Sequence, residues 1–246
     1  MNTCTLYLHS MKGGKIQVGH YARKMRVYWV EDASFITLLF MLGFTIFVMP
    51  MLLEMFIQRA ELLHLSLLAI FFAGIWSASN PIRFVLAIVL FTASLVVNAV
   101  IYYSPSPHLK ALLWVSYTLN AMVFIATNLN LLFRDDRFNF HRVIGAINVY
   151  LLVGLTGAFL FELLHYTFGS SITGDLVLTT PDQNFADYIY YSMVSLTTVG
   201  YGDILPANAA ARMLSVFLST IGILYPAVVI AKLVSAVANN ATASPK

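Results

Sequence analysis

The chain has 246 residues, of which 59% are hydrophobic and only 10% are charged. A soluble domain carries about 25% charged residues, so this composition excludes an ordinary soluble globular fold and predicts a protein surrounded mostly by lipid. The net charge of +3 is small, and the single cysteine, Cys4, gives no internal disulfide.

Residues 1–32 are predicted to form a cytoplasmic segment and not a secretory signal. Basic residues are present, but the apolar run that follows them is too long for the hydrophobic region of a signal peptide. Residues 20–30 mix Arg and Lys with Tyr and Trp. Because such side chains suit the headgroup depth of a bilayer, we expect an interfacial anchor for the first span. A regulatory or partner-binding helix is the alternative.

Six apolar segments are candidates for membrane spans, since a helix needs roughly 20 apolar residues to cross a bilayer. The second is the least clear, because Glu61 and His64 fall in its first turn. Between the fifth and the sixth, residues 167–210 are too polar to cross as one helix, but an apolar stretch of half that length lies within them at residues 185–196. That length indicates a re-entrant helix. The six candidate spans are residues 33–57, 61–79, 84–103, 111–133, 143–166 and 211–236.

The expected fold is therefore an all-α membrane protein with six transmembrane helices and a re-entrant helix and loop between the fifth and sixth. Six spans place both termini on one side. With the N-terminus inside, eleven of the fourteen Lys and Arg residues lie on the inner side, as the positive-inside rule requires. We expect a multi-pass cell-membrane protein in contact with lipid, with both termini cytoplasmic. Its predicted parts are a four-span domain at 33–133, a cytoplasmic linker at 134–142, a C-terminal membrane domain at 143–236 and a cytoplasmic tail at 237–246.

The four-span domain lacks the charges of a voltage sensor, because residues 111–133 contain no Lys, Arg, Asp or Glu. A sensor needs arginines spaced through a span, so steep voltage gating is not expected. The polar residues of the third and fourth spans are interpreted as interhelical hydrogen-bonding groups, with a small-molecule site as the alternative. They are Asn98, Asn120, Asn128 and Asn130.

The sequence contains no nucleophile–base set, zinc spacing or phosphate loop, and His64 and His165 are far apart. We expect no enzyme activity, no organic cofactor and no nucleic-acid partner.

Residues 197–203 read Thr-Thr-Val-Gly-Tyr-Gly-Asp, between the re-entrant stretch and the last span. Gly200 and Gly202 can adopt positive φ without steric cost. A backbone of alternating handedness is what successive carbonyls need in order to face one side. Carbonyls arranged in this way can replace the water oxygens around a cation.

This heptapeptide resembles the selectivity filter of potassium channels. The wider resemblance covers residues 143–236 as outer helix, pore helix, filter and inner helix, and the whole chain looks like bacterial channels with a pore module behind four uncharged spans. It implies bound K⁺ as the transported ion. Each chain holds one motif, which implies a homotetramer, and the charge distribution places the Asp203 end outside. The implied ion-binding residues are Thr198, Val199, Gly200, Tyr201 and Gly202, with Thr197 and Asp203 as supports.

The resemblance also assigns residues around the filter. Tyr190 and Tyr191 stand where many potassium channels carry a Trp-Trp pair, and Tyr190 is the expected hydrogen-bond partner of Asp203. Val194 stands where some bacterial channels have a glutamate, which leaves inactivation behaviour open. Glu162, near the outer end of the fifth span, is expected to hydrogen-bond backbone at the outer rim of the filter and not to bind ions.

The last span contains Gly222 and Pro226, four residues apart. Proline leaves the carbonyl of Gly222 without its usual helical donor, so this turn is a candidate gating hinge. A static kink or a close-packing glycine is the alternative. Because Gly222, Pro226, Ile230 and Val234 recur at i+4, they are predicted to share one face, on which Ile230 and Val234 form a hydrophobic gate.

The expected function is passive, potassium-selective conduction by a tetramer without a built-in sensor. A weakly selective cation channel is one alternative, since Tyr190, Tyr191 and Val194 depart from the usual surroundings of the filter. A non-conducting membrane receptor or subunit is another, against which the two spaced glycines argue.

Overall fold

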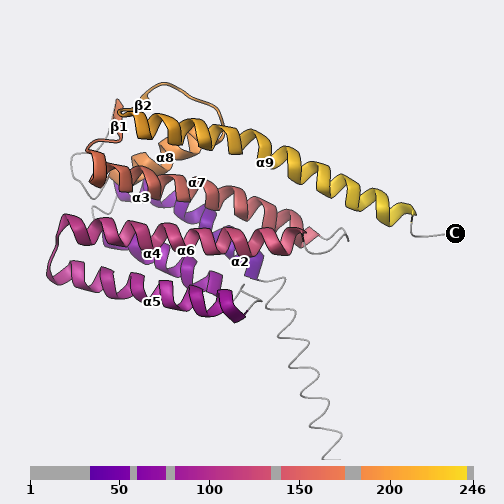
Figure 1. The fold of residues 1–246 in the computed structure, drawn as a ribbon, viewed down its shortest axis with the longest axis horizontal. Coiled ribbons are helices and arrows are strands. Elements are labelled where there is room, and N and C mark those ends of the chain that lie inside the picture. Colours follow the sequence, from indigo (N-terminus) through magenta and orange to yellow (C-terminus); the bar gives the residue numbers. More distant parts are fainter. Residues whose placement is uncertain (1–33, 56–59, 76–80, 134–139, 175–183, 243–246) are drawn as a thin grey trace, which may run out of the picture.

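A computed structural model describes residues 34–55, 60–75, 81–133, 140–174 and 184–242. They form a bundle of long helices with one small sheet at its end (Figure 1). The predicted N-terminal segment 1–32 lies outside these residues. So do Arg59, Arg134 and Arg137 of the charge distribution and the last four residues of the tail.

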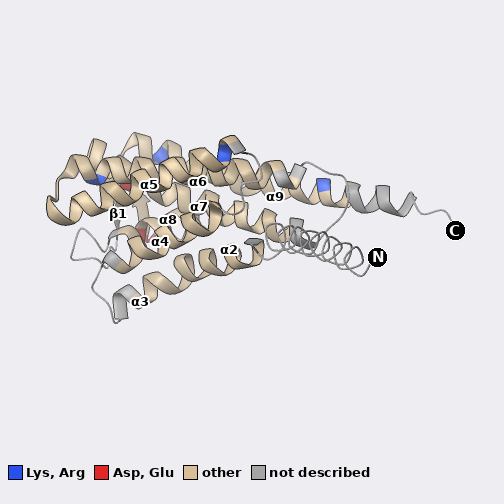
Figure 2. Cartoon of the chain, turned by 90° about the horizontal axis from the view of Figure 1, so that it is seen from below, with Lys and Arg blue, Asp and Glu red and all other residues tan. Residues whose placement is uncertain are grey.

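Within the described residues, five helices are long and apolar enough to cross a membrane. Few charged residues lie along these helices (Figure 2). The chain is thus a multi-pass membrane protein. The elements are α2 (Ser34–Gly43), η2 (Phe44–Val48), α3 (Met49–Met55), α4 (Ala60–Ile75), α5 (Pro81–Tyr103), α6 (Pro107–Phe133), α7 (Phe140–Phe168), β1 (Ile172–Gly174), α8 (Asn184–Leu196), β2 (Ile204–Pro206) and α9 (Ala209–Thr242).

The second predicted span is, in its described part, shorter than a membrane crossing requires. The described part of α4 has 16 residues, which at 1.5 Å per residue is about 24 Å, against roughly 30 Å for the hydrocarbon core of a bilayer. Leu63, Leu67, Ile70 and Phe71 of this helix are buried. The structure therefore does not confirm the count of six spans, and it packs one face of α4 against α2, α5 and α6.

The first span is not one regular helix. A π turn, η2, separates α2 from α3, and the N–H of Met49 donates to the carbonyl of Phe44, five residues earlier. Pro50 has no N–H to offer to Ile46, and a π turn is a common way to absorb such a break. The sequence analysis treated residues 33–57 as regular and did not foresee this turn.

The outer helix α7 is the centre of the molecule. It packs against α2, α6, α8 and α9, and 67% of its span is buried, against 11% for the spans of α5 and α9. Residues 134–139 alone separate α6 from α7. A connection this short makes the two helices antiparallel neighbours, so the N-terminal helices pack on the C-terminal helices of the same chain.

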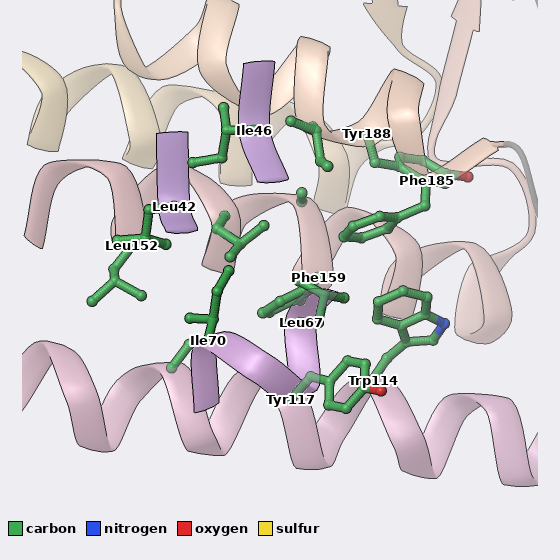
Figure 3. Packing of buried hydrophobic residues seen from close by; sticks show 14 of the residues in the cluster. Leu42, Ile46, Leu67, Ile70, Trp114, Tyr117, Leu152, Phe159, Phe185 and Tyr188 are labelled. Carbon is green, nitrogen blue, oxygen red and sulfur yellow. The ribbon is translucent and has the colours of Figure 1, made fainter. Parts of the chain in front are cut away.

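An aromatic cluster joins these two parts of the chain (Figure 3). Trp114 on α6 stacks on Phe185 in the first turn of α8, with ring centroids 4.6 Å apart and planes at 21°. Phe159 on α7 stacks on the same Phe185 ring, at 5.6 Å and 15°. All three side chains are buried. The short α8 is thus anchored at its N-terminal end by both neighbouring helices.

The fold is mostly helical, as expected, and it also contains one small two-stranded sheet. Strands β1 and β2 pair in antiparallel fashion, with Thr173 opposite Leu205 and Gly174 opposite Ile204. The sheet ties the segment after α7 to the segment that directly follows Asp203. Asn208 then caps α9, because its Oδ1 accepts the N–H of Ala211 at 2.9 Å.

The asparagines of α6 show both kinds of hydrogen bond. Asn120 on α6 donates to Ser94 Oγ on α5 at 3.1 Å, and Ser94 and Ser116 lie 2.6 Å apart across the same two helices. This confirms the interhelical interpretation for Asn120. In contrast, Asn128 and Asn130 donate to carbonyls one turn back in their own helix.

Candidate functional site: a short helix and its filter loop

The loop of residues 197–203 begins as the C-terminal cap of α8. The N–H of Val199 donates to the carbonyl of Val194 at 3.1 Å, and the N–H of Thr198 donates to that of Ser195 at 3.1 Å. Thr198 itself has φ of 60°. These bonds and a left-handed residue define a Schellman cap, in which that residue is usually glycine. The helix end and the loop are therefore one hydrogen-bonded unit.

Left-handed backbone recurs at every second residue of this loop. The φ angles are 60° at Thr198, 56° at Gly200 and 84° at Gly202. A Cβ built on either glycine would meet nothing within 4 Å in the single chain. The positive φ angle, and not a lack of room for a side chain, is therefore the reason for glycine at these positions. The two glycines were predicted from the sequence, whereas Thr198 was not, since a β-branched residue disfavours this region.

The side chains of Val199 and Tyr201, on either side of Gly200, are exposed in the single chain. Val199 is 51% exposed and Tyr201 is 73% exposed. Every residue of the loop from 197 to 203 is exposed in the single chain, and these apolar and aromatic groups have little cover from their own chain. They mark a surface that a single subunit leaves uncovered.

The Asp203 end of the loop is held by α8. The Tyr190 hydroxyl donates to Asp203 Oδ2 at 2.6 Å, the contact expected from the sequence. This hydrogen bond holds the pKa of the Asp203 carboxyl below its ordinary range. Gly174 of β1 lies against the carbonyl of Asp203 and has φ of 139°, so a side chain there would collide with that oxygen.

The second tyrosine has a different partner. Tyr191 Oη lies 2.7 Å from Ser215 Oγ on α9, and its ring packs edge-on against Phe161 of α7 at 4.9 Å. The two adjacent tyrosines thus connect α8 to different parts of the chain, Tyr190 to the filter loop and Tyr191 to α9.

Glu162 lies on α7 beside α8, and Val194 lies in the last turn of α8. Glu162 is buried on α7, with 4% of its surface exposed, and it interacts electrostatically with Tyr188 of α8. Its expected hydrogen bond to backbone at the outer rim stays a prediction. Val194 contributes through its carbonyl, which accepts the N–H of Val199.

The proposed gate residues of α9 lie in different surroundings. Gly222 lies against the carbonyl oxygen of Leu196, the last residue of α8. Ile230 and Val234 are 60% and 62% exposed in the single chain, and α9 continues through Pro226 as one helix. Four residues advance a helix by about 40° beyond a full turn, so residues spaced at i+4 drift around it. The four residues therefore do not share one environment.

Sequence reasoning missed the hydroxyl groups that fasten α8 to its neighbours. Ser192 donates to the carbonyl of Gly154 on α7 at 2.6 Å, and Ser219 on α9 donates to the carbonyl of Ser195 at 2.8 Å. The only signal was a serine in an apolar helix, which does not specify a partner. Among the described residues, no group of three or more His, Cys, Asp or Glu side chains lies together as a metal site.

Comparison with known proteins matches the C-terminal part of the chain. Residues 149–239 match the family model described as "Ion channel". This match covers less than half of the chain, and the relatives named below are potassium channels. The matched segment runs from α7 through α8 and residues 197–203 into α9. This family points to a channel and not to an enzyme.

The relatives of the pore module are potassium channels by name. The chain is similar to two pore potassium channel c of Oryza sativa subsp. japonica, with 35% identity over 83 residues, 32% of this chain and 18% of that protein. It is also similar to two-pore potassium channel 4 of Arabidopsis thaliana, with 34% identity over 71 residues, 28% of this chain and 25% of that protein.

A shorter match is to potassium channel K2 of Plasmodium berghei (strain Anka), with 50% identity over 34 residues, 14% of this chain and 2% of that protein. The matched segments therefore span a quarter or less of these relatives' own lengths. No solved structure matches the chain.

Proposed function

We propose that the protein is a homotetrameric channel that conducts K⁺ passively and selectively through residues 197–203, and that voltage does not gate it steeply. The observation that carries this proposal is the positive φ at Thr198, Gly200 and Gly202. Only a backbone that alternates in this way presents consecutive carbonyls to one axis.

The proposed chemistry is the exchange of water oxygens for carbonyl oxygens. A K⁺ ion that enters a narrow pore loses its hydration shell, and a row of carbonyl dipoles can replace it at similar free energy. The carbonyls of Thr198, Val199, Gly200 and Tyr201 would form the ion sites, and the hydroxyl of Thr198 would add the innermost oxygens. The C-terminal end of α8, which carries partial negative charge, points into this loop and favours a cation there.

The tetramer follows from what one chain lacks. One loop supplies one wall of a pore, and the exposed side chains of Val199 and Tyr201 need apolar neighbours. The long face of α9 also exposes large apolar groups, such as Phe217 and Leu224. Three further copies would cover both surfaces around a fourfold axis. In this proposal the remaining surface contacts lipid, and both termini are cytoplasmic.

The proposed voltage independence rests on α6. Its one basic residue in the described part, Lys110, lies in the first turn and not within the span. Moving one elementary charge through the membrane potential supplies about 2.3 kcal/mol per 100 mV. A helix with no charge in its span supplies almost none of this work.

Purified protein in planar bilayers with unequal K⁺ and Na⁺ concentrations tests the proposal. A reversal potential close to the K⁺ equilibrium potential is expected. A reversal midway between the K⁺ and Na⁺ potentials would indicate the weakly selective cation channel. The absence of current at every voltage would support the non-conducting receptor or subunit. The mass of the purified complex, measured by light scattering, is expected to correspond to four chains.

A further inference from the structure

The inner helix α9 faces α8 with a row of small residues at helical spacing. Ser215, Ser219 and Gly222 lie at i, i+4 and i+7, which places them on one face of α9. Each contacts a different residue in the last two turns of α8, namely Tyr191, Ser195 and Leu196 in that order. We call this contact the α8–α9 seam.

The hydrogen bonds of the seam have a definite direction at its outer end. Ser215 Oγ donates to the carbonyl of Ala211 at 2.9 Å, so it accepts the proton of Tyr191 Oη. One turn further along α9, the single proton of Ser219 Oγ has two acceptors. The Ser195 carbonyl of α8 lies at 2.8 Å and the Ser215 carbonyl of α9 at 3.0 Å. The shorter bond is the one that crosses the seam.

The carbonyl of Ser195 is also where the filter loop begins. It accepts the N–H of Thr198 at 3.1 Å, the bond that closes the cap of α8 around the left-handed Thr198. One oxygen atom therefore joins α9, the end of α8 and the first ion-binding residue. Carbonyl oxygens have two lone pairs, so both donors can be accommodated.

The neighbouring carbonyl of Leu196 is held from two sides. Gly222 of α9 lies directly against it, and any side chain at position 222 would overlap this backbone oxygen. From α7, the Tyr150 hydroxyl donates to the same oxygen at 3.4 Å. The last two carbonyls of α8 are thus fixed by atoms of the flanking helices.

We propose that Ser219 and Gly222 are positioning residues for the selectivity filter, so that α9 acts on the ion-binding carbonyls at this level through the α8–α9 seam. This inference rests on the proposed function of the loop. It assigns Gly222 to close contact with the filter support and not to free bending of α9. A displacement of α9 at Ser219 and Gly222 shifts the carbonyls of Ser195 and Leu196. This in turn shifts the α8 cap, which fixes the backbone conformation of Thr198.

The test compares two hydroxyl deletions that are one residue apart on α9. Ser219→Ala removes the bond to α8, whereas Thr220→Val removes a hydroxyl that donates only within its own helix, to the carbonyl of Val216 at 2.8 Å. We expect Ser219→Ala to lower the K⁺/Na⁺ permeability ratio roughly fivefold, the factor for one net hydrogen bond. Thr220→Val should stay close to wild type, and Ser219→Thr, which keeps a hydroxyl, should restore the ratio.

A second comparison separates positioning from bending. Gly222→Ala is expected to change both ion selectivity and open probability, because the new methyl group displaces the carbonyl of Leu196. Gly43→Ala is the control, since a Cβ at this helical glycine of α2 meets nothing within 4 Å. Size-exclusion chromatography establishes that each variant assembles. If Gly222→Ala does not assemble, the comparison of Ser219→Ala with Thr220→Val tests the positioning role.

The outcomes distinguish this inference from the function on which it depends. If the wild-type protein gives no K⁺ current, both the proposed function and the positioning role are overturned. Wild-type K⁺ selectivity that persists unchanged in Ser219→Ala overturns the positioning role alone. The same holds if Gly222→Ala changes open probability but leaves the permeability ratio unchanged, the result that a hinge would give.

Discussion

Thr198 is the residue of the filter loop at which local preference and structure disagree most. Its φ of 60° lies in the left-handed region, which costs a residue with a side chain roughly 1–2 kcal/mol. Gly200 and Gly202 adopt the same region freely. A threonine there retains a hydroxyl at the position proposed to supply the innermost oxygens. The hydrogen bonds of the α8 cap to Ser195 and Val194 hold it in place.

Replacement of Gly202 should show how much the filter depends on this backbone. Gly202→Ala is expected to abolish K⁺ selectivity or conduction, because alanine at φ of 84° costs roughly 1–2 kcal/mol and favours a return to negative φ. Reversal potentials measure the effect. Gly169 is a matched control, since it has φ of 80°, equally open surroundings and a position outside the loop. Unchanged K⁺ selectivity in Gly202→Ala would place the pore elsewhere.

Removal of the Tyr190 hydroxyl should change the response to external acid. The hydrogen bond from Tyr190 lowers the pKa of Asp203. Its stabilising effect is therefore complete above the ordinary aspartate pKa of about 4 and is lost as pH falls through the lowered value. In Tyr190→Phe the pKa returns toward the ordinary value, so current should fall at a higher external pH than in wild type.

A titration of K⁺ current against external pH checks this expectation. Tyr191→Phe is the control, because its hydroxyl bonds Ser215 and not Asp203. If the K⁺ current falls at the same acidic external pH in wild type and in Tyr190→Phe, the Asp203 carboxylate does not support conduction.

At the scale of the element, α8 is held in place by its neighbours. It has 13 residues, a length at which an isolated helix is marginal in water. Phe185 anchors its beginning in the aromatic cluster with Trp114 and Phe159, while serine hydroxyls of α8 and α9 fasten its middle and its end. This explains how a short helix can carry a loop whose backbone must keep one conformation.

Truncation of Trp114 should therefore destabilise the molecule and not only α6. Trp114→Ala is expected to cost roughly 3–5 kcal/mol of stability, as large core truncations do, and Trp114→Phe clearly less because a ring remains to stack on Phe185. Thermal unfolding of the purified protein in detergent measures both. Tyr103→Ala is the control, since this side chain is 86% exposed. An unfolding temperature of Trp114→Ala equal to that of the control would contradict the anchoring role.

At the scale of the whole molecule, the N-terminal helices support the helices that carry residues 197–203. They pack through α6 and α2 directly on α7 of the same chain, and their aromatic side chains reach α8. The span of α6 within the described residues lacks the charges that would let this contact work as a voltage sensor. The same surface can still resist or permit movement of the pore helices.

We expect the conductance to depend only weakly on voltage. A sensor with 3–4 gating charges in each of four subunits gives a steep relation, whereas this protein should show an effective gating charge below about 1 across physiological potentials. Steady-state conductance recorded at fixed, symmetrical K⁺ concentration over a range of voltages measures this. A steep sigmoidal relation would show that charge moves elsewhere in the chain.

Local features were predictable, because they depend on a residue and its immediate neighbours. The composition indicated a membrane protein, the spacing of Gly200 and Gly202 indicated left-handed backbone at both, and Asp203 was assigned to Tyr190. Helix boundaries fell within a few residues of their predicted positions for most spans. The π turn before Pro50 and the pairing of β1 with β2 were not foreseen. Both depend on which backbone N–H and carbonyl groups hydrogen-bond to each other.

The sequence by itself determined that this chain lies in a membrane, that residues 197–203 contain two glycines spaced for left-handed backbone and that residues 111–133 have no charge. These properties are set by side-chain chemistry and local backbone preference. Only the tertiary structure decided the partner of Ser219, the close approach of Gly222 to Leu196, and the packing of α4 against α2, α5 and α6. A serine or glycine in an apolar helix fits many neighbours, and the packing of α8 between α7 and α9 selects one of them.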